Sequence, residues 1–255
     1  MRGATSPSIA AVRHGARTRF TVGLVIALLL GVAVAVAAMT TSSTYAITPG
    51  SVLRVDPQLR GVGAAPALAT PGVAMVDVRL SQLTNLGVFL DRLFGNATLL
   101  SATDLGLSGG ENLATYQRED RHLMDQSVLD AISAADRELR RRFHRGLPGR
   151  VTIVRGAIGG PSAGLAQGLA IIDRELRGSL SRGRFVVASG ALAATGAVGP
   201  VGGLSAKLTA VERSRATIFF VPRVELAAVM SDHPHGVTVI GVTSLDEAVR
   251  VLEAR

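Results

Sequence analysis

The 255-residue sequence contains no cysteine and no tryptophan, and lysine occurs once. The absence of cysteine excludes a disulfide scaffold and a cysteine-based metal site. Charged residues make up only 18% of the chain and aromatic residues 4%, but 47% of the residues are hydrophobic, which is too apolar for a disordered protein. At about 150 residues per domain, the length allows one domain with an appendage or two small domains.

Acidic residues are absent before Asp56, whereas residues 1–39 contain four arginines. These arginines supply half of the net charge of +8, so the remaining chain carries only a modest positive charge. We therefore expect no nucleic-acid partner.

Residues 20–39, FTVGLVIALLLGVAVAVAAM, contain no charge. A helix of this length spans roughly 30 Å of hydrocarbon, enough to cross a bilayer once. Because the four arginines precede it, the positive-inside rule places residues 1–19 in the cytoplasm and the chain after about residue 40 outside. We expect a single-pass protein of the cell membrane with an extracytoplasmic domain.

A secretory signal peptide is the competing interpretation of the same segment. Ala33, Ala35 and Ala37 could form an A-x-A cleavage site. The apolar run is longer than a usual signal-peptide core, which favours a retained anchor.

Two regions precede the part of the chain that is richest in motifs. Residues 40–72 are rich in Ser, Thr, Gly and Pro without periodicity, which predicts a stalk. Within residues 73–150, alternation predicts a strand at 76–80, and apolar spacing predicts helices at 83–93 and 115–143.

The second of these helices ends in a basic cluster formed by Arg140, Arg141, Arg142 and Arg145. The cluster is interpreted as a solvated helix end whose cations complement the helix dipole. Contact with an anionic surface is the alternative.

From residue 151 onward, strand and helix patterns alternate regularly, which predicts an α/β domain at residues 151–255. We expect strands at 151–154, 184–189, 217–221 and 237–242, and helices at 163–177, 204–215, 223–230 and 244–254. Function is expected in the glycine-rich turns at 158–164 and 195–203.

Ser162 lies in one of these turns, directly before an amphipathic helix. A serine at this position caps a helix well. It also has free backbone N–H groups and the positive end of the helix dipole beside it, which could stabilise an oxyanion. Ser162 is therefore a candidate nucleophile.

Lys207, the single lysine, falls on the apolar face of its predicted helix, with Leu204, Leu208 and Val211. Burial against apolar surface is expected to lower the pKa of the lysine, so that a neutral amine can act as a base. Arginine could not take this role. The alternative is a lysine that extends its ammonium group to water.

The motifs GGPSAG (159–164) and GPVGGLSAK (199–207) resemble the two defining motifs of the Lon-type serine protease domain. The resemblance implies that Ser162 is the nucleophile and Lys207 the general base. Ser189, in VASGAL, matches the position of a threonine that hydrogen-bonds the lysine in that family.

The resemblance covers residues 151–255 and implies an α/β (α+β) Lon proteolytic domain fold, preceded by one transmembrane helix and a small strand–helix region. It implies a serine endopeptidase without cofactor or metal, acting on exported or unfolded polypeptides and assembling as a homo-oligomeric ring. The glycines of the motifs are expected to support the site: Gly160, Gly164, Gly202 and Gly203.

The N-terminal layout is similar to that of membrane-anchored Lon-like proteases that carry a PDZ domain. About seven residues separate Phe143 from Val151, so we expect the PDZ domain to be absent. No G-x-x-x-x-G-K-[ST] motif occurs, so the expected proteolysis is independent of ATP.

Related sequences often place an acid shortly before the serine; residues 157–160 contain none. This departure motivates the alternative of a weak or inactive, anchored peptide-binding module.

Two further alternatives use other residues. Residues 160–164 also satisfy G-x-S-x-G, the nucleophile turn of α/β-hydrolases, with Asp173 and then His233 or His235 as partners in chain order. The two histidines with Asp232 could also be metal ligands, although the intervening proline favours an exposed loop.

Overall fold

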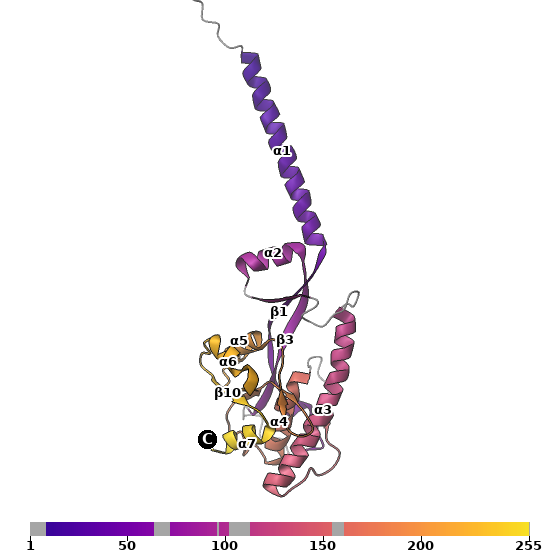
Figure 1. The fold of residues 1–255 in the computed structure, drawn as a ribbon, viewed down its shortest axis with the longest axis vertical. Helices are drawn as coiled ribbons and strands as arrows, with labels where there is room; N and C mark the ends of the chain where they lie inside the picture. The colour runs from indigo at the N-terminus through magenta and orange to yellow at the C-terminus, as the bar shows by residue number, and fades with distance from the viewer. Residues whose placement is uncertain (1–8, 64–71, 96, 102–112, 155–160, 255) are drawn as a thin grey trace, which may run out of the picture. The chain divides into compact units, whose positions relative to one another are not determined.

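The computed structural model describes residues 9–63, 72–95, 97–101, 113–154 and 161–254 (Figure 1). It divides into two compact units. The first contains two helices, α1 (Ile9–Met39) and α2 (Asn85–Phe94), and the second contains a mixed α/β arrangement. The α/β class predicted from the sequence is therefore observed.

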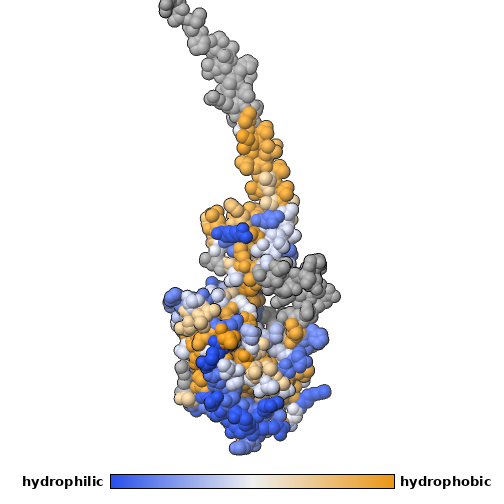
Figure 2. All heavy atoms as spheres, viewed as in Figure 1, coloured by the Kyte–Doolittle hydropathy of each residue, from blue (hydrophilic) through white to orange (hydrophobic). Residues whose placement is uncertain are grey.

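The helix α1 contains the apolar segment Val22–Met39, which is long and apolar enough to cross a membrane and has no buried residue. Figure 2 shows its apolar surface in orange. A membrane span and a signal sequence both have these properties. In the same unit, α2 begins after Thr84, whose Oγ1 accepts the N–H of Gly87 at 3.1 Å, as expected for an N-cap. This helix was predicted from its apolar spacing.

Six strands form the main sheet in the order β10-β9-β6-β3-β1-β4. Their bounds are β1 Thr41–Arg54, β3 Val73–Thr84, β4 Thr98–Ser101, β6 Val186–Ala188, β9 Ile218–Pro222 and β10 Thr238–Val242. The strands β3, β6, β9 and β10 run parallel, with Val186 paired to both Val73 and Ile218.

The sheet therefore begins well before residue 151, where the sequence predicted the start of the domain. The second compact unit, which contains most of this sheet, comprises Ala46–Ser81 and Ala97–Arg255. Residues 40–72 were expected to form a stalk, but they contribute β1 to the sheet, between β3 and β4. The difference arises because pairing with β3, and not local alternation, makes this segment a strand.

Two short antiparallel pairs lie outside the main sheet. One joins β2 (Leu59–Arg60) to β5 (Thr152–Ile153), and the other joins β7 (Ala191–Leu192) to β8 (Val198–Gly199). The strand predicted at 151–154 is thus present as β5, but it pairs with β2 instead of joining the parallel strands.

The remaining helices agree with the sequence prediction to within a few residues. They are α3 Leu113–Phe143, α4 Gly164–Glu175, α5 Leu204–Ser214, α6 Leu226–Ser231 and α7 Leu245–Ala254, with 3₁₀ turns η1 Asp56–Gln58, η2 Pro161–Ala163 and η3 Arg223–Glu225.

Helices cover both faces of the sheet. Along β6, Val186 and Ala188 belong to a core cluster with α3, α4 and α7, whereas Val187 belongs to a second cluster with α5 and α6. Because successive side chains of a strand point to opposite faces, the two clusters lie on opposite sides. Buried faces on both sides are typical of parallel sheets.

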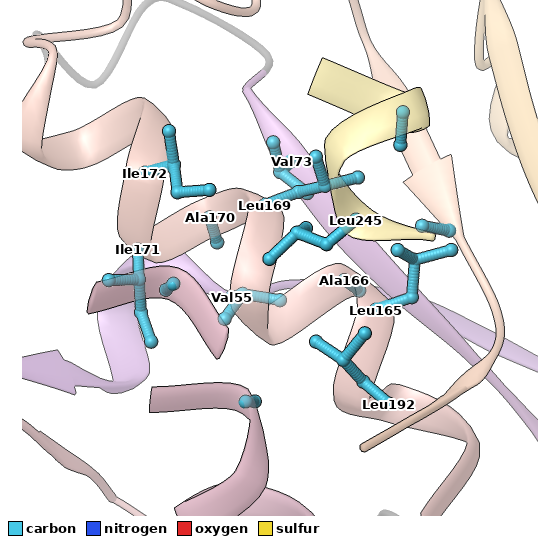
Figure 3. Close-up of a cluster of buried hydrophobic side chains, with 14 of the residues drawn as sticks. Val55, Val73, Leu165, Ala166, Leu169, Ala170, Ile171, Ile172, Leu192 and Leu245 are labelled. Atoms are coloured by element: carbon cyan, nitrogen blue, oxygen red, sulfur yellow. The ribbon is translucent and has the colours of Figure 1, made fainter. Parts of the chain in front are cut away.

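The helix α4 forms the centre of the first cluster, since every residue from Gly164 to Asp173 is buried. Figure 3 shows Leu165 and Leu169 of this helix among Val73, Leu192 and Leu245. A helix packed on all sides cannot shift easily, so its first turn has a fixed position in the domain. That turn follows Ser162.

The basic cluster at the end of α3 is paired with carboxylates inside the domain. Arg141 and Arg142 both bind Glu138 and Asp246, which joins α3 to α7. Burial raises the pKa of Asp246, but hydrogen bonds from Arg142 and Arg141 outweigh this effect and lower the pKa to about 2. The cluster therefore has an internal structural role, which the sequence did not indicate.

Candidate active site

Ser162 lies in the turn η2, immediately before α4, and is partly exposed. Two neighbouring elements hold this turn. The N–H of Gly190 donates to the carbonyl oxygen of Ser162 at 2.8 Å, and the N–H of Leu165 donates back to the carbonyl oxygen of Gly190 at 3.0 Å. From the other side, Ser127 Oγ of α3 donates to the carbonyl oxygen of Pro161 at 3.1 Å. The serine therefore has a defined backbone position in a partly exposed turn.

Lys207 lies on α5 and is only 3% exposed. Leu204, Leu208 and Val211 of the same helix are buried with it, as the apolar spacing predicted. An ammonium group that extends to water is not compatible with this burial. Lys207 Nζ donates a hydrogen bond to Ser189 Oγ at 3.1 Å, and Ser189 is fully buried. The contact that the resemblance implied between these two residues is thus present.

The serine turn and the lysine each contact the segment that follows β6. Ser189 and Gly190 follow this strand directly. Ser189 accepts the hydrogen bond from Lys207, and the adjacent Gly190 is bound through its backbone to the Ser162 turn. One dipeptide therefore links both candidate catalytic residues, which come from elements on opposite faces of the sheet.

Gly190 is a supporting residue that sequence reasoning missed. A Cβ atom at this position would lie 2.8 Å from Val198 Cγ1 and 3.3 Å from Leu165 Cβ. Any side chain would therefore push the dipeptide away from the serine turn. A glycine two residues after a buried strand was the available signal, because it marks a close approach of another segment.

The motif glycines have different environments. A Cβ at Gly164 would lie 2.9 Å from the Leu192 backbone nitrogen and 2.9 Å from Ser127 Oγ, so only glycine fits. Gly203 precedes α5 with a φ of 69°, in the left-handed region that favours glycine. Gly202 faces open space, and Gly160 lies outside the described residues.

A pocket of about 390 Å³ opens beside the serine turn and includes Pro161 in its lining. Leu192 and Val198 of the β7–β8 pair contribute apolar surface, and α3 supplies another wall with Leu123 and Ser127. The sequence did not assign α3 to the site. Ser127 on a long, polar helix carries no motif that would distinguish it from a solvated residue.

Asp173 does not have the position that an α/β-hydrolase triad would require. It lies nine residues into α4 from Gly164, roughly 14 Å along the helix axis. Its Oδ1 accepts the N–H groups of Leu180 and Ser181, at 3.1 and 2.8 Å, which is a structural role.

The histidines of the alternative metal site, His233 and His235, are exposed between α6 and β10. The backbone N–H of His235 donates to Glu212. Across the described ranges, no group of three or more His, Cys, Asp or Glu residues could hold a metal ion.

No protein-family model and no curated protein matches this chain.

Proposed function

We propose that this chain is an ATP-independent serine endopeptidase of the Lon type, with Ser162 as nucleophile and Lys207 as general base. One observation carries the proposal. The single lysine of the chain is 3% exposed and hydrogen-bonded to Ser189, and the residue after Ser189 is bound to the Ser162 turn. A solvated surface lysine would be neither buried nor hydrogen-bonded to a buried serine.

The environment of Lys207 suits proton transfer. Burial disfavours the charged ammonium form relative to the neutral amine, and Nζ is held by its hydrogen bond to Ser189 Oγ. The neutral amine accepts the hydroxyl proton of Ser162 as the serine oxygen attacks a peptide carbonyl. The protonated amine then donates this proton to the leaving amino group.

The second half of the reaction uses the same groups. A water molecule transfers a proton to Lys207 and attacks the acyl-serine ester, and the proton returns to Ser162 as the acid product leaves. Ser162 directly precedes α4, so the positive end of the helix dipole and the N–H groups of its first turn, apart from the Leu165 N–H that donates to Gly190, lie beside it. Such donors stabilise the negative oxygen of each tetrahedral intermediate.

The pocket beside Pro161 supports a preference for substrates with an apolar side chain near the cleaved bond. Its lining includes Leu123, Leu192 and Val198. We propose unfolded segments of exported polypeptides as substrates, because a partly buried serine can be reached by an extended chain. Assembly into a ring remains an expectation from the resemblance.

For the location, we propose that α1 is a retained single-pass anchor with its N-terminus in the cytoplasm. The apolar segment Val22–Met39 supports this proposal, and the arginines before it set the orientation by the positive-inside rule. The proteolytic domain then lies on the extracytoplasmic side.

The test is hydrolysis of casein by the full-length chain in lipid nanodiscs. We expect cleavage by the wild type and no cleavage by Ser162→Ala or Lys207→Ala. Ser205→Ala is the matched control, because Ser205 is exposed on the same helix as Lys207, and it should retain activity. A folded wild type that does not cleave would favour the alternative function, an anchored peptide-binding module.

A further inference from the structure

The helix α2 exposes an apolar face that the proposed peptidase function does not use. Its residues Phe89, Leu90, Leu93 and Phe94 are 60%, 46%, 59% and 78% exposed. Two of the seven phenylalanines in the chain are among them. On a protein surface that faces water, large apolar side chains clustered on one short helix indicate an interaction site.

The face is continuous along the helix. Leu86, Phe89, Leu90 and Leu93 follow the spacing i, i+3, i+4, i+7 of one helical face. Asp91 lies opposite this face, and the exposed Arg92 lies at its flank, outside the apolar positions. A short helix with an apolar face that includes phenylalanine and an opposite polar face is typical of segments that lie in a membrane interface.

The end of α1 lies directly beside the start of α2, within the same compact unit. The Asn85 N–H donates to the carbonyl oxygen of Thr40 at 3.0 Å, and Asn85 Nδ2 donates to Thr40 Oγ1 at 2.9 Å. Thr40 is the first residue after the apolar segment that ends at Met39. These two bonds hold α2 at the level where α1 would leave the bilayer, and Figure 1 draws α2 across the direction of α1.

We propose that the apolar face of α2 lies in the headgroup and upper acyl region of the bilayer leaflet from which α1 emerges. The inference rests on the proposed anchoring by α1. Lipid is the occupant that fits, because an anchored chain holds this face at the bilayer surface without any additional partner. The helix would then attach the strands β1 and β3, which both contribute residues to this unit, to the membrane at a second point.

The test uses spin labels on the full-length chain in nanodiscs of phosphatidylcholine and phosphatidylglycerol. Because the chain contains no cysteine, each single-cysteine variant carries one label. Leu93→Cys reports the apolar face and Arg92→Cys, on the same helix, is its matched control. Val32→Cys reports the apolar segment of α1. For each label, collision with oxygen, which concentrates in lipid, is compared with collision with a water-soluble nickel chelate.

We expect oxygen to reach the label at position 93 several-fold better than the chelate does, with the reverse at position 92. The label at position 32 should be reached by oxygen and protected from the chelate. Phe89→Cys should give the same result as Leu93→Cys, because both residues are on one face.

Two results would contradict the proposed position of α2 in the membrane without contradicting the anchoring by α1. Chelate access at position 93, with position 32 in lipid, would place α2 in water. Protection of position 93 from both reagents would show that protein, such as a second copy of the chain, covers the face. Chelate access at position 32 would instead refute the anchor itself, and with it the membrane attachment of α2.

Discussion

Ser162, Ser189 and Lys207 have different environments, and each fits a different chemical role. Ser162 is partly exposed, as the proposed nucleophile role requires, whereas Lys207 and Ser189 are buried. The burial of Lys207 could be predicted from apolar spacing on one helix, and the motifs indicated Ser162. Ser127 could not be predicted, because its role depends on a contact between elements that are distant in the sequence. Gly190 carried only the general signal of a glycine after a buried strand.

Replacing Lys207 with arginine keeps a positive charge at this position but removes the ability to accept a proton. The guanidinium group stays protonated at any accessible pH, so it cannot accept the serine proton. We expect kcat/KM for a peptide substrate to fall by about 10²- to 10⁴-fold, the range of general-base catalysis. Lys207→Met should lose activity to the same extent, with thermal unfolding followed in parallel. Substantial activity in a folded Lys207→Arg variant would remove the base role.

Replacing Ser189 tests its positioning role. Ser189→Ala removes the hydroxyl that accepts the hydrogen bond from the buried Lys207, which costs about 0.5–1.5 kcal/mol in the free energy of unfolding. We expect kcat to fall and its dependence on pH to change, as measured by peptide hydrolysis across pH. Ser189→Thr retains a hydroxyl and should recover activity. Equal losses in the Ala and Thr variants would indicate that only packing matters at this position.

At the scale of elements, the helices of the chain were predicted well and the strands less well. The helices α2, α3, α4 and α7 each carry a sustained apolar spacing, which is a local signal. The pair β7–β8 contains two residues on each side, too few for any alternation. Its position is determined by packing against the serine turn and α4, which the sequence alone does not show.

The contact between the serine turn and β7 leads to a prediction at Gly164. A methyl group there would lie 2.9 Å from the backbone nitrogen of Leu192, so the turn or β7 must shift. We expect Gly164→Ala to lower the free energy of unfolding by about 1–3 kcal/mol and to reduce hydrolysis. Urea denaturation of the full chain in detergent measures the first effect.

Gly202→Ala is the matched control in the second motif. The added methyl group at Gly202 meets no atom within 4 Å, so the change in unfolding free energy should stay within about 0.5 kcal/mol. Equal effects of the two alanine substitutions would contradict the packing that places the serine turn.

At the scale of the whole molecule, the domain depends on pairings between distant parts of the chain. Val73 of β3 pairs with Val186 of β6, and α3 is joined to α7 through Asp246. The start of the domain was predicted at residue 151 because strand and helix patterns repeat regularly from there onward. The pairing of β3 with β6 and the contacts of α3 extend the domain towards the N-terminus. Neither feature is visible as a pattern in the local sequence.

The carboxylates between α3 and α7 predict a loss of stability in acid. Because the pKa of folded Asp246 is lowered from 3.8 to about 2, its carboxylate stabilises the fold above about pH 4, and this contribution disappears as the pH falls to about 2. Asp246→Asn should lower the free energy of unfolding by about 1–2 kcal/mol at neutral pH. In urea denaturation, the difference from the wild type should vanish near pH 2, whereas a difference independent of pH would exclude this ionic role.

The most direct test of the central claim is covalent labelling of Ser162. The full-length chain in nanodiscs is treated with a fluorophosphonate, and the adduct is measured by intact mass and located by peptide mapping. We predict one adduct, on Ser162, that is absent in Ser162→Ala and strongly reduced in Lys207→Met, while Ser205→Ala labels like the wild type. An adduct on another serine, or labelling of Ser162 that does not depend on Lys207, would contradict the Ser–Lys mechanism.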